Sequence, residues 1–200
     1  CYRHPFFTFL FLGTALNNAS TVCRHTFNLL FATEELHMTA AQYGRVMAAG
    51  SVVSAVVIVL VGYVMDKIHP LRVFLGSGII VILANIWGYY YVTDYASFFV
   101  VGIAISVVYA IQYLSNGPVF VDLFPPDKYG QFCSANAMMN CVLLIFANYF
   151  GSMAIDRFGY RFIFAWDTIF TIGATLALIY VYVKWKQLGG AKGYVPPPTD

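Results

Sequence analysis

The sequence is short of charge. Asp, Glu, Lys and Arg together make up 10% of the 200 residues, whereas hydrophobic residues make up 60%. Soluble chains carry roughly 25% charged residues, so this chain has too little charge to cover its apolar side chains in water. A soluble globular protein is therefore excluded, and we expect a protein embedded in a lipid bilayer. The net charge of +2 is also too small and too scattered to indicate a nucleic-acid partner.

Motifs for metal binding and covalent catalysis are missing as well. The four cysteines lie in or beside apolar runs, with no CxxC pair and no histidine spacing typical of zinc. We interpret them as small packing residues and expect no metal and no cofactor. The sequence also lacks a His-x-x-Glu-His motif, a Gly-x-Ser-x-Gly nucleophile elbow and a Walker lysine loop, so we do not expect an enzyme.

Long apolar runs are present instead. A helix that crosses a membrane needs about 20 mainly apolar residues, and six such runs follow one another with short connections. Runs of this length exclude barrel strands, which are about ten residues long and alternate with period two. The sequence therefore predicts an all-α polytopic membrane bundle over residues 1–188, with an extended, mobile, cytoplasmic, proline-containing tail at 189–200. The expected spans are 6–32, 43–65, 71–92, 98–120, 132–155 and 160–183.

Lys and Arg are distributed unequally between the two ends of these spans. The end that holds both termini carries seven of them and the opposite end carries three. Cytoplasmic loops are enriched in Lys and Arg, so we expect both termini in the cytoplasm and the protein in the cell membrane. The seven are Arg3, Lys67, Arg72, Lys128, Lys184, Lys186 and Lys192, and the three are Arg45, Arg157 and Arg161.

The chain shows signs of an internal repeat of three spans. The second span ends in Gly62 to Lys67 and the fifth in Ser152 to Arg157, and both segments place Asp and then a basic residue after a small one. The offset is 90 residues. Because three is odd, the second copy crosses the membrane in the opposite sense, which predicts an inverted three-plus-three repeat, a layout common in secondary transporters. The alternative is that this ending is simply a common way to finish a membrane helix.

The connection between the second and third spans resembles the loop signature of the major facilitator superfamily. It departs from that signature at His69-Pro70, where a Gly usually follows the Asp-basic pair. The resemblance covers nearly all of the chain and implies the C-terminal six-helix half of a twelve-span carrier. Its partner is then a missing N-terminal six-helix half, which the absence of a starting Met favours, or a second copy. The residues that carry the resemblance are Gly62-x-x-x-Asp66-Lys67-x-x-Pro70-Leu71-Arg72, with Asp156 to Arg161 before the last span.

The same loop is a candidate conformational latch formed by Gly62, Asp66, Lys67 and Arg72. An Asp at the C-terminal end of a helix faces an unfavourable dipole, so it needs a positive partner such as Lys67 or Arg72. If that contact breaks as the protein rocks, it biases one conformation by about 1 to 3 kcal/mol. The alternative is a surface ion pair worth less than about 1 kcal/mol.

Polar residues inside the spans indicate which faces avoid lipid, because such residues are costly at the midplane. In the first span they recur at three- and four-residue spacing, which places them on one face, and the fourth and fifth spans carry similar stripes. We expect the first, fourth and fifth helices to line one water-filled cavity and the third and sixth to face lipid. The candidate solute-binding residues are Asn17, Thr21, Arg24, Asn28, Tyr109, Gln112, Tyr113, Asn116, Asn136 and Asn140.

Two charges within the spans need separate consideration. Arg24 keeps its proton and costs at least about 2.5 to 3.5 kcal/mol at a helix centre, so it requires a partner. It contacts either the solute or, as a structural or gating pair, one of Asp167, Glu34 and Glu35. Asp167 lies well inside the last span and is a candidate carrier of a coupling proton, an arginine partner or a residue at headgroup level.

These features predict a secondary active transporter that moves a small polar solute, either a sugar or an organic anion, by alternating access. Coupling to a proton or a sodium ion, as in symport, is expected. The alternative is a non-transporting six-span receptor or scaffold whose polar stripes are interhelical hydrogen bonds worth about 0.6 kcal/mol each. A channel is a third interpretation.

Overall fold

The computed structural model describes residues 1–198, and the regular structure in that range is helical. Six of its helices are long and apolar enough to cross a membrane, so the predicted all-α bundle of six spans is confirmed. They are α1 (Pro5–Leu30), α2 (Ala40–Ile68), α3 (Pro70–Tyr91), α4 (Tyr95–Leu123), α5 (Tyr129–Phe158) and α6 (Phe162–Gln187). Shorter elements are the π-helical turn η1 (Phe31–Glu35), the 3-10 turn η2 (Pro126–Lys128) and α7 (Gly190–Gly193).

Where a polar residue caps the start of a helix, the helix begins before the apolar run predicted from the sequence. Thr39 accepts a hydrogen bond from the backbone N–H of Gln42 at 3.2 Å, and Asp94 accepts one from that of Ser97 at 2.8 Å. The side chain of the third residue of each helix accepts a hydrogen bond from the backbone N–H of the capping residue, which completes a capping box at each helix start. The hydrogen bonds from Ser97 also lower the pKa of Asp94. α2 and α4 therefore begin three residues before the expected spans.

Two local expectations are corrected by the structure. The sequence predicts that the fourth span ends at residue 120, but α4 continues through Pro118 to Leu123. Membrane helices tolerate an internal proline because neighbouring groups satisfy the freed backbone carbonyl. The tail, expected to be extended, contains α7, and the hydroxyl of Tyr194 donates to the carbonyl of Leu123 at 3.0 Å. Residues 199–200 of the predicted tail lie outside the described residues.

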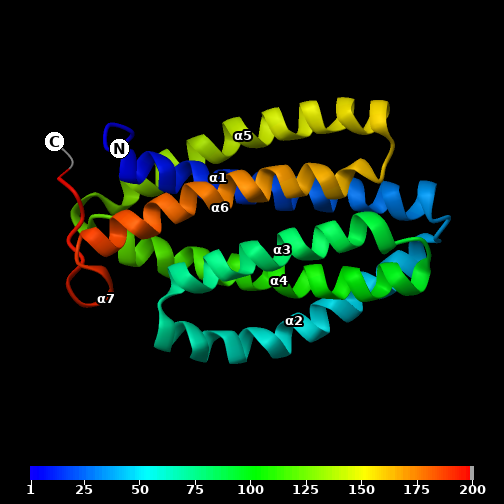
Figure 1. Ribbon diagram of the computed structural model, residues 1–200, viewed down its shortest axis with the longest axis horizontal. Helices are drawn as coiled ribbons and strands as arrows, with labels where there is room; N and C mark the ends of the chain where they lie inside the picture. Colours follow the sequence, from blue (N-terminus) through cyan, green and yellow to red (C-terminus); the bar gives the residue numbers. More distant parts are fainter. Residues whose placement is uncertain (199–200) are drawn as a thin grey trace.

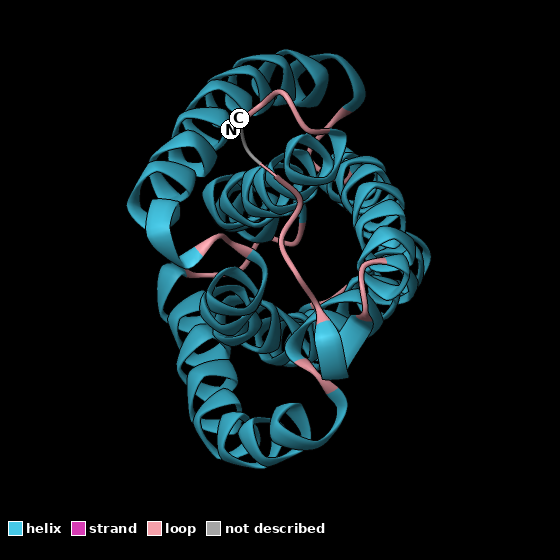
Figure 2. Ribbon diagram, turned by 90° about the vertical axis from the view of Figure 1, so that its left-hand side faces the viewer, coloured by secondary structure: helices cyan, strands magenta, loops and turns pink. Residues whose placement is uncertain are grey.

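The helices run along one long axis, with both termini and the α2–α3 and α4–α5 connections at the same end (Figure 1). Figure 2 views the bundle from that end. The most extensive contacts join α1 to α5 and α6, α4 to α2 and α3, and α3 to α6. If α1, α2 and α3 exchange places with α4, α5 and α6, respectively, the same helix pairs are in contact. This symmetry is consistent with a three-plus-three repeat. Inversion of that repeat stays a prediction.

Two hydrophobic clusters rich in aromatic residues lie toward opposite ends of the bundle. Phe7, Phe11 and Trp185 belong to the cluster near the termini, and Phe31 and Phe164 to the cluster at the far end. α2 and α5 are the spans least covered by the rest of the structure, with 17% of the apolar window buried in each, against 61% in the first span. Their outer apolar surfaces therefore face lipid or another protein surface.

Candidate solute site and the buried polar network

A buried polar network crosses the middle of the bundle and is centred on Asp167 of α6, which is fully buried. Its Oδ2 accepts hydrogen bonds from Asn85 Nδ2 of α3 at 2.7 Å and from the Tyr109 hydroxyl of α4 at 2.5 Å. Its Oδ1 accepts from the Thr171 hydroxyl at 3.2 Å and from Ser20 of α1. An ionised carboxylate only accepts hydrogen bonds, so four donors suit the charged form of Asp167.

Arg24 of α1 joins this network through an amide rather than by direct contact with the carboxylate. Its Nη1 donates to Asn85 Oδ1 at 3.3 Å, and its guanidinium carbon lies 3.8 Å from the centre of the Phe164 ring. Asn85 thus bridges the buried cation and the buried anion. Glu35, another expected partner, instead accepts from Arg161 Nε at 2.8 Å. The geometry favours a structural or gating role for Arg24 that involves Asp167.

A cavity of about 400 Å³ is lined in part by Asn85 and Phe164. Two further cavities, which share lining residues with each other, lie beside the network. The larger, of about 640 Å³, is lined by Thr21, His25, Met47, Ser51, Ser54, Ala55, Ile58, Ser106, Tyr109, Ala110, Tyr113 and Leu114. The smaller, of about 10 Å³, is lined in part by Arg24 and Asn28 and shares His25 and Tyr109 with the larger one. The walls of the large cavity come from α1, α2 and α4, so α2 occupies the place in it that the sequence assigned to the fifth helix.

The structure brings five of the predicted solute-binding residues to these cavities. Thr21, Tyr109 and Tyr113 line the large one, and Arg24, Asn28 and again Tyr109 line the small one. The Tyr113 side chain is 84% exposed.

The other five predicted residues lie outside these two linings. Gln112 is buried, and neither its amide oxygen nor its amide nitrogen has a hydrogen-bond partner within residues 1–198. Asn116 Oδ1 is likewise unpartnered there, and Asn17 is buried. On α5, Asn136 Oδ1 accepts from the Thr14 hydroxyl at 2.8 Å, and Asn140 Nδ2 donates to the backbone carbonyl of Asn136 at 2.9 Å. Their role in solute binding stays a prediction.

A sequence profile of the Major Facilitator Superfamily matches residues 9–198. The chain belongs to this superfamily. Its members are membrane transporters, so the chain is an integral membrane protein of a transporter superfamily, as its loop signature implied. Searches of curated proteins and of solved structures gave no match. The six spans are consistent with one half of the twelve-span arrangement implied by the resemblance.

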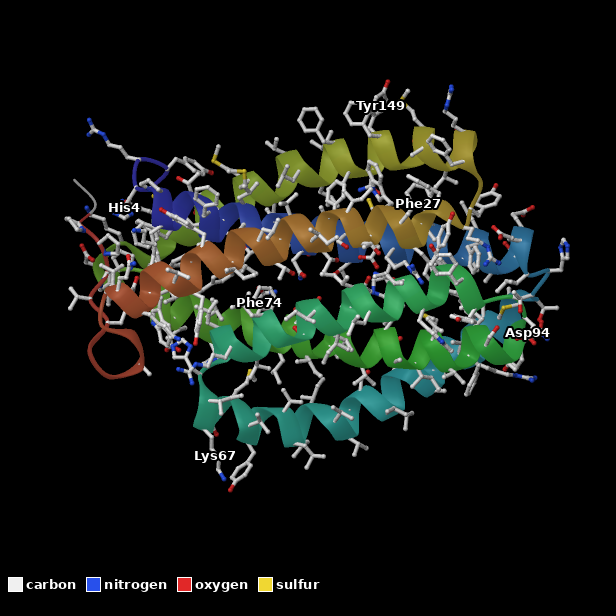
Figure 3. The ribbon with its side chains drawn as sticks, viewed as in Figure 1. His4, Phe27, Lys67, Phe74, Asp94 and Tyr149 are labelled. Carbon is white, nitrogen blue, oxygen red and sulfur yellow. The ribbon has the colours of Figure 1, made fainter. Side chains whose placement is uncertain are left out.

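The superfamily loop is exposed at the end of α2, and Lys67 points away from the bundle (Figure 3). The Lys67 ammonium lies 4.2 Å from the Tyr63 ring centre, and the Arg72 guanidinium carbon lies 6.0 Å from that of Tyr182. The space around Gly62 is open. Asp66 belongs to neither of the two ion pairs in the described part of the chain. A latch made by these residues therefore stays a prediction.

A different contact ties this loop to the bundle. His69 Nε2 lies 3.5 Å from Asp122 Oδ2 at the end of α4, and the His69 ring packs on Trp185 of α6 with centres 4.3 Å apart. Burial lowers the pKa of His69, and the nearby Asp122 carboxylate opposes that change. The residue that departs from the superfamily signature thus connects the loop to two other helices.

Sequence reasoning missed Asn85 and Phe164, which hold Arg24 in place. The third span was expected to face lipid because most of its residues are apolar, and Ile79 and Ile80 do lie on its exposed face. The opposite face is buried and carries Asn85. An asparagine near the middle of an apolar span was the available signal, because such residues avoid lipid. Phe164 gave no signal, since one phenylalanine in an apolar run resembles any other.

Proposed function

We propose that the chain forms half of a secondary active transporter that moves a small polar solute, a sugar or an organic anion, across the cell membrane by alternating access. The observation that carries this proposal is the position of Tyr109. Its side chain lines both cavities, while its hydroxyl donates to the buried Asp167. A solute in the cavity therefore touches a residue that also belongs to the network joining α1, α3, α4 and α6, which provides a physical route from occupancy to helix movement.

Ion coupling fits the same geometry. Protonation of Asp167 would cancel the charge that balances Arg24 and turn one acceptor oxygen into a donor, so the hydrogen bonds from Tyr109 and Asn85 would have to rearrange. His25, whose ring centre lies 5.8 Å from that of Tyr109, also lines the large cavity, so a rearrangement of Tyr109 reaches the cavity wall. A proton is the coupling ion that this arrangement favours over sodium.

The second wall of the transport path comes from another six-helix unit, either an N-terminal half or a second copy. α2 and α5 offer the least covered apolar surfaces for that contact. The proposed orientation places both termini and the lysine-rich end in the cytoplasm. In this chain the cavity is walled by α1, α2 and α4. Either an N-terminal half or a second copy can supply the opposite wall.

Sided thiol labelling tests alternating access without knowledge of the solute. Cysteines at Ser54 and Tyr113, in the full-length protein freed of native cysteines, are expected to react with a membrane-impermeant reagent from one side at a time. Conditions that raise labelling from one side lower it from the other. A cysteine at Leu176, exposed on α6 toward lipid, is the matched control and should stay unreactive. Simultaneous labelling from both sides indicates a channel, and no labelling from either side contradicts a solute cavity.

A further inference from the structure

We infer that the solute is a neutral polyhydroxy compound, a sugar or sugar alcohol, rather than an organic anion. This inference rests on the proposed function and narrows its substrate class. The first argument is charge. Among the described residues, the lining of the large cavity includes no Asp, Glu, Lys or Arg side chain. The one cation nearby, Arg24, is already balanced by Asp167 through Asn85, so the site has no surplus positive charge for an anion.

The second argument is that four of the hydroxyl groups on the cavity wall already donate their protons to acceptors within the protein. Thr21 donates to Asn17 O at 3.0 Å, Ser51 to Met47 O at 2.9 Å and Ser106 to Gly102 O at 2.7 Å. Tyr109 donates to Asp167. What these four side chains offer a solute is oxygen lone pairs. A sugar hydroxyl can donate to them, whereas an ionised carboxylate has only lone pairs of its own.

The third argument comes from the small cavity. Arg24 Nε, a donor, and Asn28 Oδ1, an acceptor, are both buried there without a partner in the part of the chain that the structure describes. Its volume of about 10 Å³ holds roughly one water-sized group. A hydroxyl is such a group, and it can accept from Arg24 while donating to Asn28. A carboxylate oxygen can satisfy Arg24, but it has no proton to donate to Asn28 Oδ1 and would place lone pairs against the lone pairs of that oxygen.

These arguments place one solute hydroxyl between Arg24 and Asn28, with the rest of the molecule in the large cavity. The two cavities share His25, Met47, Ser106 and Tyr109, so one solute can reach both. Ser54 Oγ is buried and unpartnered within the described residues and is a further group for a solute hydroxyl. The exposed Tyr113 ring offers a flat surface to the apolar C–H face of a sugar ring.

Thermal unfolding of the full-length protein with matched pairs of compounds tests this assignment. Each pair shares a pyranose ring and differs in charge: glucose with glucuronate, mannose with mannuronate, and galactose with galacturonate. A ligand that binds only the folded protein stabilises it by RT ln(1 + [L]/Kd), so its Tm keeps rising with the logarithm of the ligand concentration above Kd. At least one neutral member is expected to raise the Tm with this concentration dependence, and its acid should give no shift at the same concentration.

Variants locate the hydroxyl. Asn28→Leu should weaken binding of the neutral sugar roughly tenfold to a hundredfold, because it removes the acceptor of a buried hydrogen bond. Ser54→Ala deletes a buried hydroxyl that has no partner within the described residues, so it should not destabilise the fold and should raise the Tm of the empty protein. It should also weaken sugar binding. Thr26→Ala is the matched control on α1, because Thr26 is exposed and its hydroxyl bonds its own helix at Val22 O. It should leave binding unchanged.

The outcomes that overturn the inference differ from those that overturn the transporter proposal. Acids that bind better than their neutral partners, or the absence of a shift with every neutral member, reject a neutral polyhydroxy solute. Sugar affinity unchanged in Asn28→Leu means that the small cavity holds water only and rejects the placement of the hydroxyl. In each case alternating thiol labelling would leave the transporter proposal standing, whereas static labelling would remove it.

Discussion

Replacing Asp167 by alanine is expected to destabilise the folded protein by about 3 to 5 kcal/mol and to abolish solute transport. The substitution leaves Arg24 buried without a balancing charge, and it removes the acceptor of the hydrogen bonds from Asn85, Tyr109, Thr171 and Ser20. Breaking a buried ion pair by removing one partner is costly because the other charge remains desolvated. Reversible unfolding in detergent measures the change in stability.

A double variant separates charge balance from function. Arg24→Met with Asp167→Leu removes both charges, and apolar replacements of a buried pair are often neutral or stabilising. The double variant is therefore expected to be more stable than Asp167→Ala and still inactive, because the network that couples Tyr109 to α6 is gone. Asp156→Ala, at the exposed end of α5, is the control and should change stability by less than about 0.5 kcal/mol. A double variant no more stable than the single one contradicts the assignment of Arg24 and Asp167 as a pair.

Gly88→Ala is expected to cost about 1 to 3 kcal/mol and to reduce transport strongly, although Gly88 touches neither cavity. A Cβ atom at Gly88 would overlap the ring of Phe164, which is fully buried. That ring stacks on the Arg24 guanidinium, so moving it displaces the cation from Asn85. A methyl group added on α3 thus disturbs the polar network by displacing the Phe164 ring. Unfolding and solute uptake, measured together on the same preparation, report the two effects.

The control for Gly88→Ala lies on the same helix. At Gly76 a Cβ atom would meet open space, so Gly76→Ala should be neutral or should stabilise α3 by about 0.5 to 1 kcal/mol through helix propensity. Phe164→Leu in the Gly88→Ala background frees space and should restore part of the lost stability. Equal effects of the two glycine substitutions would contradict the role given to Phe164.

Hydrophobic pattern alone predicted the spans, and in the first span it also predicted the inward face. Asn17, Ser20, Arg24 and Asn28 repeat at helical spacing and are all buried in the structure. The spacing within one helix determines which residues share a face, so this part of the fold follows from local periodicity.

What could not be predicted is which faces meet. The structure puts α2 rather than α5 in the wall of the large cavity, and Ser51 and Ser54, its polar residues, lie in a run rich in valine. Pairing of helices depends on packing between segments far apart in sequence. At Gly50 of α2 a Cβ atom would lie 2.8 Å from Ser106 Oγ of α4, so this close approach requires glycine. No local sequence pattern predicts this contact between α2 and α4.

The bridge by Asn85 illustrates the same limit. Sequence reasoning offered Asp167 as a partner of Arg24 because both are charges inside spans, and the structure connects them through an amide on a third helix. Charge indicates that a partner is needed, but only the fold determines whether the contact is direct.

Solute counterflow in proteoliposomes tests the central claim, which is that the cavity between α1, α2 and α4 carries a neutral solute across the membrane. Vesicles with the full-length protein are loaded with the unlabelled sugar that binds best, and the labelled sugar is added outside. We predict transient, saturable accumulation of label, its loss in Ala55→Trp, which fills the cavity, and its retention in Thr26→Ala. Flux that does not saturate, or accumulation that Ala55→Trp leaves unchanged, would contradict the account.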